Sequence, residues 1–147
     1  MNFPRLIASG FGSGFFPVAP GTAGSLVALA VGTPLLLVSP WLLAAAALAA
    51  SAGGVWAVRA SNAHGDPGWI VIDEFAGQWI AMLGLGTVTP LGLLAAFTLF
   101  RLFDIWKPGP VGWADRWHTP AGVMADDVIA GAMAAGILVA ARAIWAA

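Results

Sequence analysis

Long stretches of this sequence contain no charged side chain. Residues 6–58 and 75–100 hold no Asp, Glu, Lys or Arg, and a helix that spans a bilayer needs about 20 predominantly apolar residues. Charged residues make up 9% of the 147-residue chain, against about 25% in soluble domains. So few charges cannot cover the surface of a water-soluble protein of this length. The sequence therefore indicates an integral membrane protein.

The apolar residues fall into four runs, at 25–38, 41–58, 75–100 and 128–145. A helix satisfies its own backbone hydrogen bonds in lipid, so each run is predicted to be helical. Residues 1–24 are rich in Gly and Pro and are expected to form a loop. We predict an all-α fold, with a single domain over residues 1–147. It would be a membrane-embedded bundle of about five helices, some of them short, with a glycine-rich N-terminal loop.

The run at 75–100 has two interpretations. It is either one tilted span or two short helices joined by a turn at residues 87–90. The second interpretation places the N-terminal loop, residues 59–74 and residues 101–127 on one side of the membrane. That side then carries most of the basic residues, namely Arg5, Arg59, Arg101, Lys107 and Arg116. The positive-inside rule places such a side in the cytoplasm.

Charged residues next to the apolar runs form clusters. They are the pair Asp73 and Glu74, the triplet Arg101, Asp104 and Lys107, and the pair Asp126 and Asp127. The spacing of three residues keeps the triplet roughly on one side of a helix. Several carboxylates without His or Cys suit a hard cation such as Mg²⁺. The alternative is that each acidic pair opens and caps a helix, where the dipole favours negative charge. Because basic residues accompany the acids, we favour a functional site.

The segment PVAPGTAGS at residues 17–25 adds a second signal. Its glycines let backbone N–H groups converge, and Thr22 or Ser25 can donate a hydroxyl ahead of a helix N-terminus that favours anions. No Lys follows the glycine, so the segment is not a Walker A loop. Together with the acidic and basic clusters, it indicates a phosphate site at a membrane surface.

At these residues the sequence resembles the bacterial phosphatidylglycerophosphatase A family of membrane lipid phosphatases. Four blocks carry the resemblance: PVAPGTAGS at 17–25, DPGWIVIDEFAGQWIA at 66–81, FRLFDIWKPGPVG at 100–112 and GVMADDVIAG at 122–131. The resemblance implies Mg²⁺-dependent conversion of phosphatidylglycerophosphate to phosphatidylglycerol. It also implies a multi-pass protein of the bacterial inner membrane whose active site faces the cytoplasm.

The resemblance also implies roles for individual residues. The implied metal ligands are Asp73, Glu74, Asp104, Asp126 and Asp127; the implied catalytic residues are Asp73, Glu74, Asp104, Lys107 and Asp127; and the implied substrate-binding residues are Gly21, Thr22, Ser25, Arg101 and Lys107. Asp66 belongs either to this set or to a turn. The chain departs from the family pattern between residues 112 and 121, which leaves the role of His118 open. We interpret His64 and His118 as solvated side chains rather than ligands.

Elimination favours attack by metal-activated water, because the sequence offers no Cys nucleophile and no paired aspartates of the phosphoaspartate type. Two alternatives remain: a small ion- or proton-coupled transporter, and a structural membrane subunit with capped helices. A net charge of −1 without a run of basic residues does not favour nucleic-acid binding. Small residues at 131–136 allow close helix packing, including packing between two copies of the chain.

Overall fold

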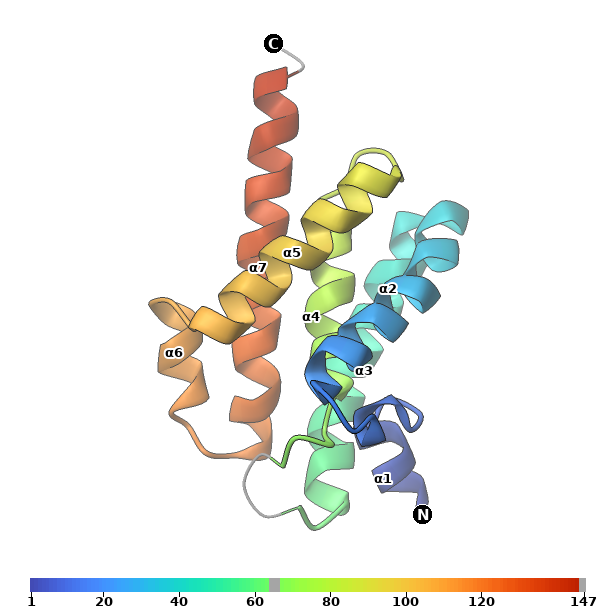
Figure 1. Ribbon diagram of the computed structural model, residues 1–147, viewed down its shortest axis with the longest axis vertical. Helices are drawn as coiled ribbons and strands as arrows, with labels where there is room; N and C mark the ends of the chain where they lie inside the picture. Colours follow the sequence, from blue (N-terminus) through green and yellow to red (C-terminus); the bar gives the residue numbers. More distant parts are fainter. Residues whose placement is uncertain (64–66, 146–147) are drawn as a thin grey trace.

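Figure 1 shows the protein as a computed structural model, which describes residues 1–63 and 67–145. The helices are α1 (Phe3–Ala8), the 3₁₀ turn η1 (Ser13–Phe15), α2 (Pro20–Val38), α3 (Pro40–Ala60), α4 (Ile72–Leu83), α5 (Pro90–Trp106), α6 (Pro110–Asp115) and α7 (Pro120–Trp145). The described residues contain no strand, so the predicted all-α class is confirmed. The two hypotheses on His64 and Asp66 fall outside the described residues.

Proline and short polar residues decide where the long helices begin. Proline occupies the first turn of α2, α3 and α5, where its missing N–H removes no helical hydrogen bond. Ser39 caps α3 by accepting a hydrogen bond from the Trp41 amide at 3.2 Å, and Thr89 caps α5 by accepting one from the Gly92 amide at 3.0 Å. The residues that interrupt the apolar runs are therefore the residues that start the helices.

Helix α4 is the centre of the bundle, and it packs against α2, α3, α5 and α7. It packs tightly against α7, because two glycines face each other there. A Cβ atom on Gly131 of α7 would lie 2.3 Å from the backbone oxygen of Gly77 on α4. Around α4 lie α2, α3 and α7, the three described helices that are long and apolar enough to cross a membrane.

The run at 75–100 forms two helices, as the hairpin interpretation predicted. Helix α4 ends at Leu83 and α5 starts at Pro90, so the chain reverses between them. In Figure 1 this turn and the α2–α3 turn lie toward one end of the molecule, whereas α1, α6 and the start of α4 lie toward the other. Arg142 lies at the first of these ends, where it donates a hydrogen bond to the Gly84 carbonyl at 3.0 Å.

Two predicted boundaries are wrong. The N-terminal loop is shorter than expected, because α1 occupies residues 3–8 and α2 begins at Pro20. Gly21, Thr22 and Ser25 are therefore helical residues. The last helix begins at Pro120 rather than near residue 128, so Asp126 and Asp127 lie inside α7 and do not open it. The capping explanation fails for that pair, because capping acts within the first turn.

Candidate active site

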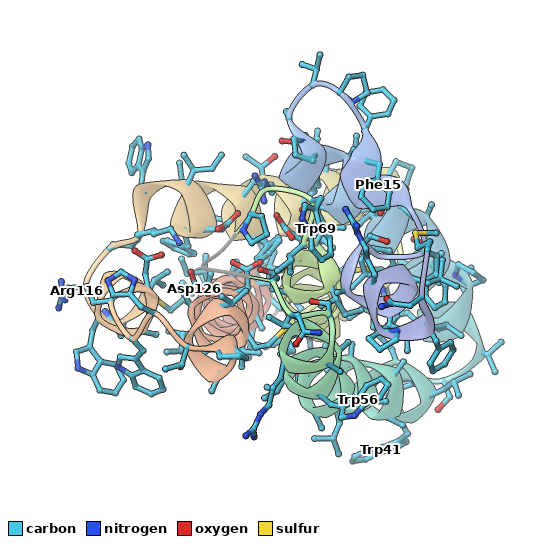
Figure 2. All side chains as sticks on the ribbon, turned by 90° about the horizontal axis from the view of Figure 1, so that it is seen from below. Phe15, Trp41, Trp56, Trp69, Arg116 and Asp126 are labelled. Atoms are coloured by element: carbon cyan, nitrogen blue, oxygen red, sulfur yellow. The ribbon has the colours of Figure 1, made fainter. Side chains whose placement is uncertain are left out.

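A cavity of about 280 Å³ lies where the first turns of α2 and α4 meet the end of α5 and the acidic pair of α7. Its lining residues are Pro20, Gly21, Gly68, Ile70, Asp73, Glu74, Arg101, Asp104, Ile105, Lys107, Asp126 and Asp127. The fold thus brings all three predicted charged clusters into one cavity. Figure 2 views the molecule from this end and shows Asp126 in the region that α5, α6 and α7 surround.

Three of the carboxylates lie close enough to share one ion. Asp73, Glu74 and Asp127 each present an oxygen, and these oxygens lie within 4.8 Å of one another. Glu74 Oε2 and Asp127 Oδ2 are buried and have no hydrogen-bond partner among the described residues. A buried carboxylate oxygen without a donor is strongly unfavourable. A hard cation would satisfy both oxygens, so this donor set fits Mg²⁺.

Arg101 of α5 connects the carboxylates of Glu74 and Asp104 to the start of α2. Its guanidinium forms a salt bridge with Asp104, and its Nη1 lies 3.6 Å from Glu74 Oε1. The same nitrogen lies 3.5 Å from Ser25 Oγ, which in turn donates a hydrogen bond to the Gly21 carbonyl at 2.8 Å. Arg101 is therefore held from three directions, with its planar group at the cavity.

Lys107 occupies the other side of the cavity, at the end of α5. Its φ of 49° is left-handed and ends the helix. The ammonium lies 2.6 Å from Asp115 Oδ1 on α6 and 2.6 Å from Asp126 Oδ2 on α7. Burial lowers the pKa of Lys107, but the two carboxylates raise that pKa by more, so it lies above its ordinary value. Lys107 is consequently a cation throughout the neutral pH range.

The charges lining the cavity do not balance. Five carboxylates and two cations face it, which leaves an excess of three negative charges when all are ionised. Charges removed from water require partners. The carboxylates that line the cavity outnumber the cations that line it, so the cavity favours additional positive charge.

Not every predicted residue lines the cavity. Thr22 lies in the first turn of α2 but is absent from the lining, and Ser25 lies behind Arg101. His118 precedes α7 with a φ of 47° and also does not line the cavity. Sequence reasoning missed Asp115 as a partner of Lys107. The only sequence signal for this role was that Asp115 is a carboxylate within residues 112–121, which depart from the family pattern.

The chain is similar to known proteins over most of its length. The family model described as Phosphatidylglycerophosphatase A matches residues 6–142. Phosphatidylglycerophosphatase A of Escherichia coli K12 is 41% identical over 140 residues, which cover 91% of this chain and 80% of that protein. Its counterpart of the same name in Haemophilus influenzae is 39% identical over 150 residues, covering 99% and 91%.

A third relative carries a different name. A Bacteroides thetaiotaomicron protein, provisionally named as a phosphatidylinositol-3-phosphatase, is 39% identical over 148 residues, which cover 95% of this chain and 93% of that protein. No solved structure matches the chain.

Proposed function

The chain belongs to the phosphatidylglycerophosphatase A family and is a phosphatase, and from that premise we propose that it hydrolyses phosphatidylglycerophosphate to phosphatidylglycerol and phosphate with the help of Mg²⁺. The observation that carries the proposal is the cavity itself. Three carboxylates converge there beside Arg101 and Lys107, and two of their buried oxygens, Glu74 Oε2 and Asp127 Oδ2, have no hydrogen-bond partner among the described residues. A metal site next to cations suits a phosphoryl group, whose transfer depends on positioning and charge stabilisation.

We assign the metal to Asp73, Glu74 and Asp127, because these three oxygens lie together. Asp104 and Asp126 belong to the same cavity but are paired with Arg101 and Lys107, respectively. In our proposal these two acids orient the cations. Bound Mg²⁺ supplies Lewis-acid activation of water and neutralises charge on the phosphoryl oxygens.

The remaining groups bind and orient the phosphate. Arg101 presents a planar fork of donors that matches phosphoryl oxygens, and Lys107 adds a compact positive charge. The start of α2 lies at the cavity through Pro20 and Gly21. Free N–H groups in the first turn of a helix favour an anion, so the Gly21 and Thr22 backbone completes the phosphate site. One of the cavity carboxylates accepts the proton of the attacking water.

The charge distribution supports a position in the bacterial inner membrane with the cavity facing the cytoplasm. Lys107 and Arg101 line the cavity, and Arg5 lies in α1 at the same end of the bundle. Arg142 lies at the opposite end, beside the α4–α5 turn. Basic residues gather on the cytoplasmic side of membrane proteins. Phosphatidylglycerophosphate would then enter from the cytoplasmic leaflet.

The test is phosphate release by detergent-purified protein, with Mg²⁺ and then with a chelator. Phosphatidylglycerophosphate is compared with phosphatidic acid and with phosphatidylinositol 3-phosphate, because one relative carries a name that points to the latter. Selective release that stops with the chelator supports the proposal. Absence of release from folded, metal-supplied protein would favour the transporter or the structural subunit instead.

A variant of one ligand tests the assignment of the metal site. Asp127→Asn keeps the size of the side chain and removes its charge, so the bundle should still fold. Loss of outer-shell metal partners already costs about 10–100-fold, so loss of a direct ligand should lower kcat/KM by at least about 100-fold. Full turnover by this variant, at unchanged helical circular dichroism, would remove Asp127 from the mechanism.

A further inference from the structure

Gln78 of α4 is a buried polar residue without a structural explanation. Its side chain has no exposed surface, and neither its amide nitrogen nor its amide oxygen has a hydrogen-bond partner among the described residues. Buried polar groups in native proteins are nearly always paired, and an unpaired one is associated with function or with a bound water. A Leu or Met would fill the same space without this penalty.

The position of Gln78 connects it to the proposed metal site. It follows Glu74 by four residues on α4, so the two side chains are neighbours on one face of the helix. Glu74 lines the cavity and Gln78 does not, which places Gln78 one turn deeper in the bundle. The oxygen of Glu74 that lacks a hydrogen-bond partner within residues 1–63 and 67–145 is Oε2.

Helix α2 contacts α4 at the level of Glu74. A Cβ atom on Gly21 would lie 2.2 Å from Glu74 Oε1, so the starts of α2 and α4 are in contact at this level. Both helices run in the same general direction from there (Figure 1), and Ser25 lies one turn beyond Gly21. Arg101 reaches Ser25 with Nη1, and its own Nε is buried without a hydrogen-bond partner in the part of the chain that the structure describes.

The buried atoms of Glu74, Gln78 and Arg101 that lack hydrogen-bond partners among the described residues are chemically complementary. Glu74 Oε2 is an acceptor, Arg101 Nε is a donor, and the Gln78 amide offers both functions. We propose that Gln78 is a positioning residue for the metal site, and that its amide N–H holds Glu74 Oε2 through one buried water. This inference rests on the proposed function, because it assigns Glu74 to the metal.

Such a contact fixes the orientation of the Glu74 carboxylate before a metal binds. A carboxylate with a fixed orientation loses less freedom on binding, and outer-shell partners of metal ligands typically change affinity by about 10–100-fold. The burial of an otherwise unfavourable amide is then maintained by the function of the site rather than by stability.

The test replaces Gln78 with Met, which has a similar length and no amide. A purely structural role predicts that Gln78→Met leaves the affinity for metal unchanged. A positioning role predicts a dissociation constant for Mn²⁺ that is about 10–100-fold higher, with no fall in the thermal midpoint of the metal-free protein. Mn²⁺ binding is measured by electron paramagnetic resonance, and Mg²⁺ binding by the rise in thermal midpoint with metal concentration. Neither readout depends on activity.

Two further variants make the test specific. Met82→Leu alters another fully buried residue of α4, one turn beyond Gln78, and should leave the Mn²⁺ affinity unchanged. In a Glu74→Gln background, Gln78→Met should cost little further affinity, because Gln78 acts through Glu74.

Each outcome decides the matter. A variant that binds Mn²⁺ within twofold of the wild type would overturn the role of Gln78 and leave the proposed function intact. Wild-type protein that binds neither metal would overturn the metal site and this inference with it. If Gln78→Met does not fold, Gln78→Leu is measured in its place. Failure of both variants to fold would overturn the proposal, since Gln78 would then serve the fold.

Discussion

Replacing Gly21 with alanine tests the contact between α2 and the carboxylate of Glu74. The added Cβ would lie 2.2 Å from Glu74 Oε1 and 3.3 Å from both terminal nitrogens of Arg101. An ordinary contact between carbon and oxygen is about 3.3 Å, so Glu74 Oε1 must move by about 1 Å. The methyl group adds no charge and removes none, which separates geometry from electrostatics.

The magnitude follows from that displacement. A misplacement of about 1 Å in an active site can cost about 100-fold in rate, which is about 2.7 kcal/mol of transition-state stabilisation. We therefore expect Gly21→Ala to lower kcat/KM for phosphatidylglycerophosphate by about 100-fold. The fold should persist, because the atom that must move is the end of a flexible side chain. Alanine also has a higher helix propensity than glycine, by up to about 1 kcal/mol.

The assay is phosphate release at saturating Mg²⁺, together with the thermal midpoint of each protein. Gly136→Ala is the matched control, because a Cβ atom at this glycine of α7 would meet nothing within 4 Å. The control should keep wild-type activity and a thermal midpoint at or above that of the wild type. Activity of Gly21→Ala within about threefold of the control would refute the placement of Glu74 against α2.

Further predictions concern helix packing and the second cation. Gly131→Ala places a Cβ 2.3 Å from the Gly77 backbone oxygen, which cannot move aside. Overpacking costs about 1–3 kcal/mol, so the thermal midpoint should fall by several degrees. An unchanged midpoint would contradict the close α4–α7 contact. In Lys107→Asn the new asparagine tolerates the backbone φ of 49° at this position, but Asp126 loses its ammonium partner. The free energy of unfolding should therefore fall by about 1–3 kcal/mol, and kcat/KM should fall by about 10-fold or more. Because the pKa of Lys107 is raised on folding, its contribution is complete below the unfolded pKa of about 10.4 and is lost only as pH rises through the folded pKa. The stability difference between wild type and Lys107→Asn, from denaturant unfolding, should therefore be equal at pH 7 and pH 9, and its loss at pH 9 would contradict the pairing.

The charge pattern predicted much of the site because charges are rare in this chain. Asp73 and Glu74 open α4 as expected, and Arg101 and Asp104 share a face at the end of α5. A bundle in lipid has few places for charged groups, so rare charges that lie at the ends of apolar runs are brought together. The roles of these residues in binding and catalysis remain predictions.

Helix boundaries were harder to predict where small residues dominate. The segment before Asp126 contains Pro120 and Gly122, which read as a loop, yet α7 starts at Pro120. Proline is favourable in a first turn, and packing of α7 on α4 maintains the helix through glycine. Local propensity is weak compared with tertiary contacts.

The amino-acid sequence was enough to predict the class of the protein, since its apolar runs, sparse charges and four motif blocks allow few alternatives to a helical membrane phosphatase. Tertiary structure decided which side chains share a cavity. It folded residues 75–100 into a hairpin, placed Asp115 beside Lys107, and buried the Gln78 amide without a hydrogen-bond partner among the described residues. The physical reason is that hydrophobic patterning acts along the chain, whereas pairing of buried polar groups depends on distances between helices that no local pattern encodes.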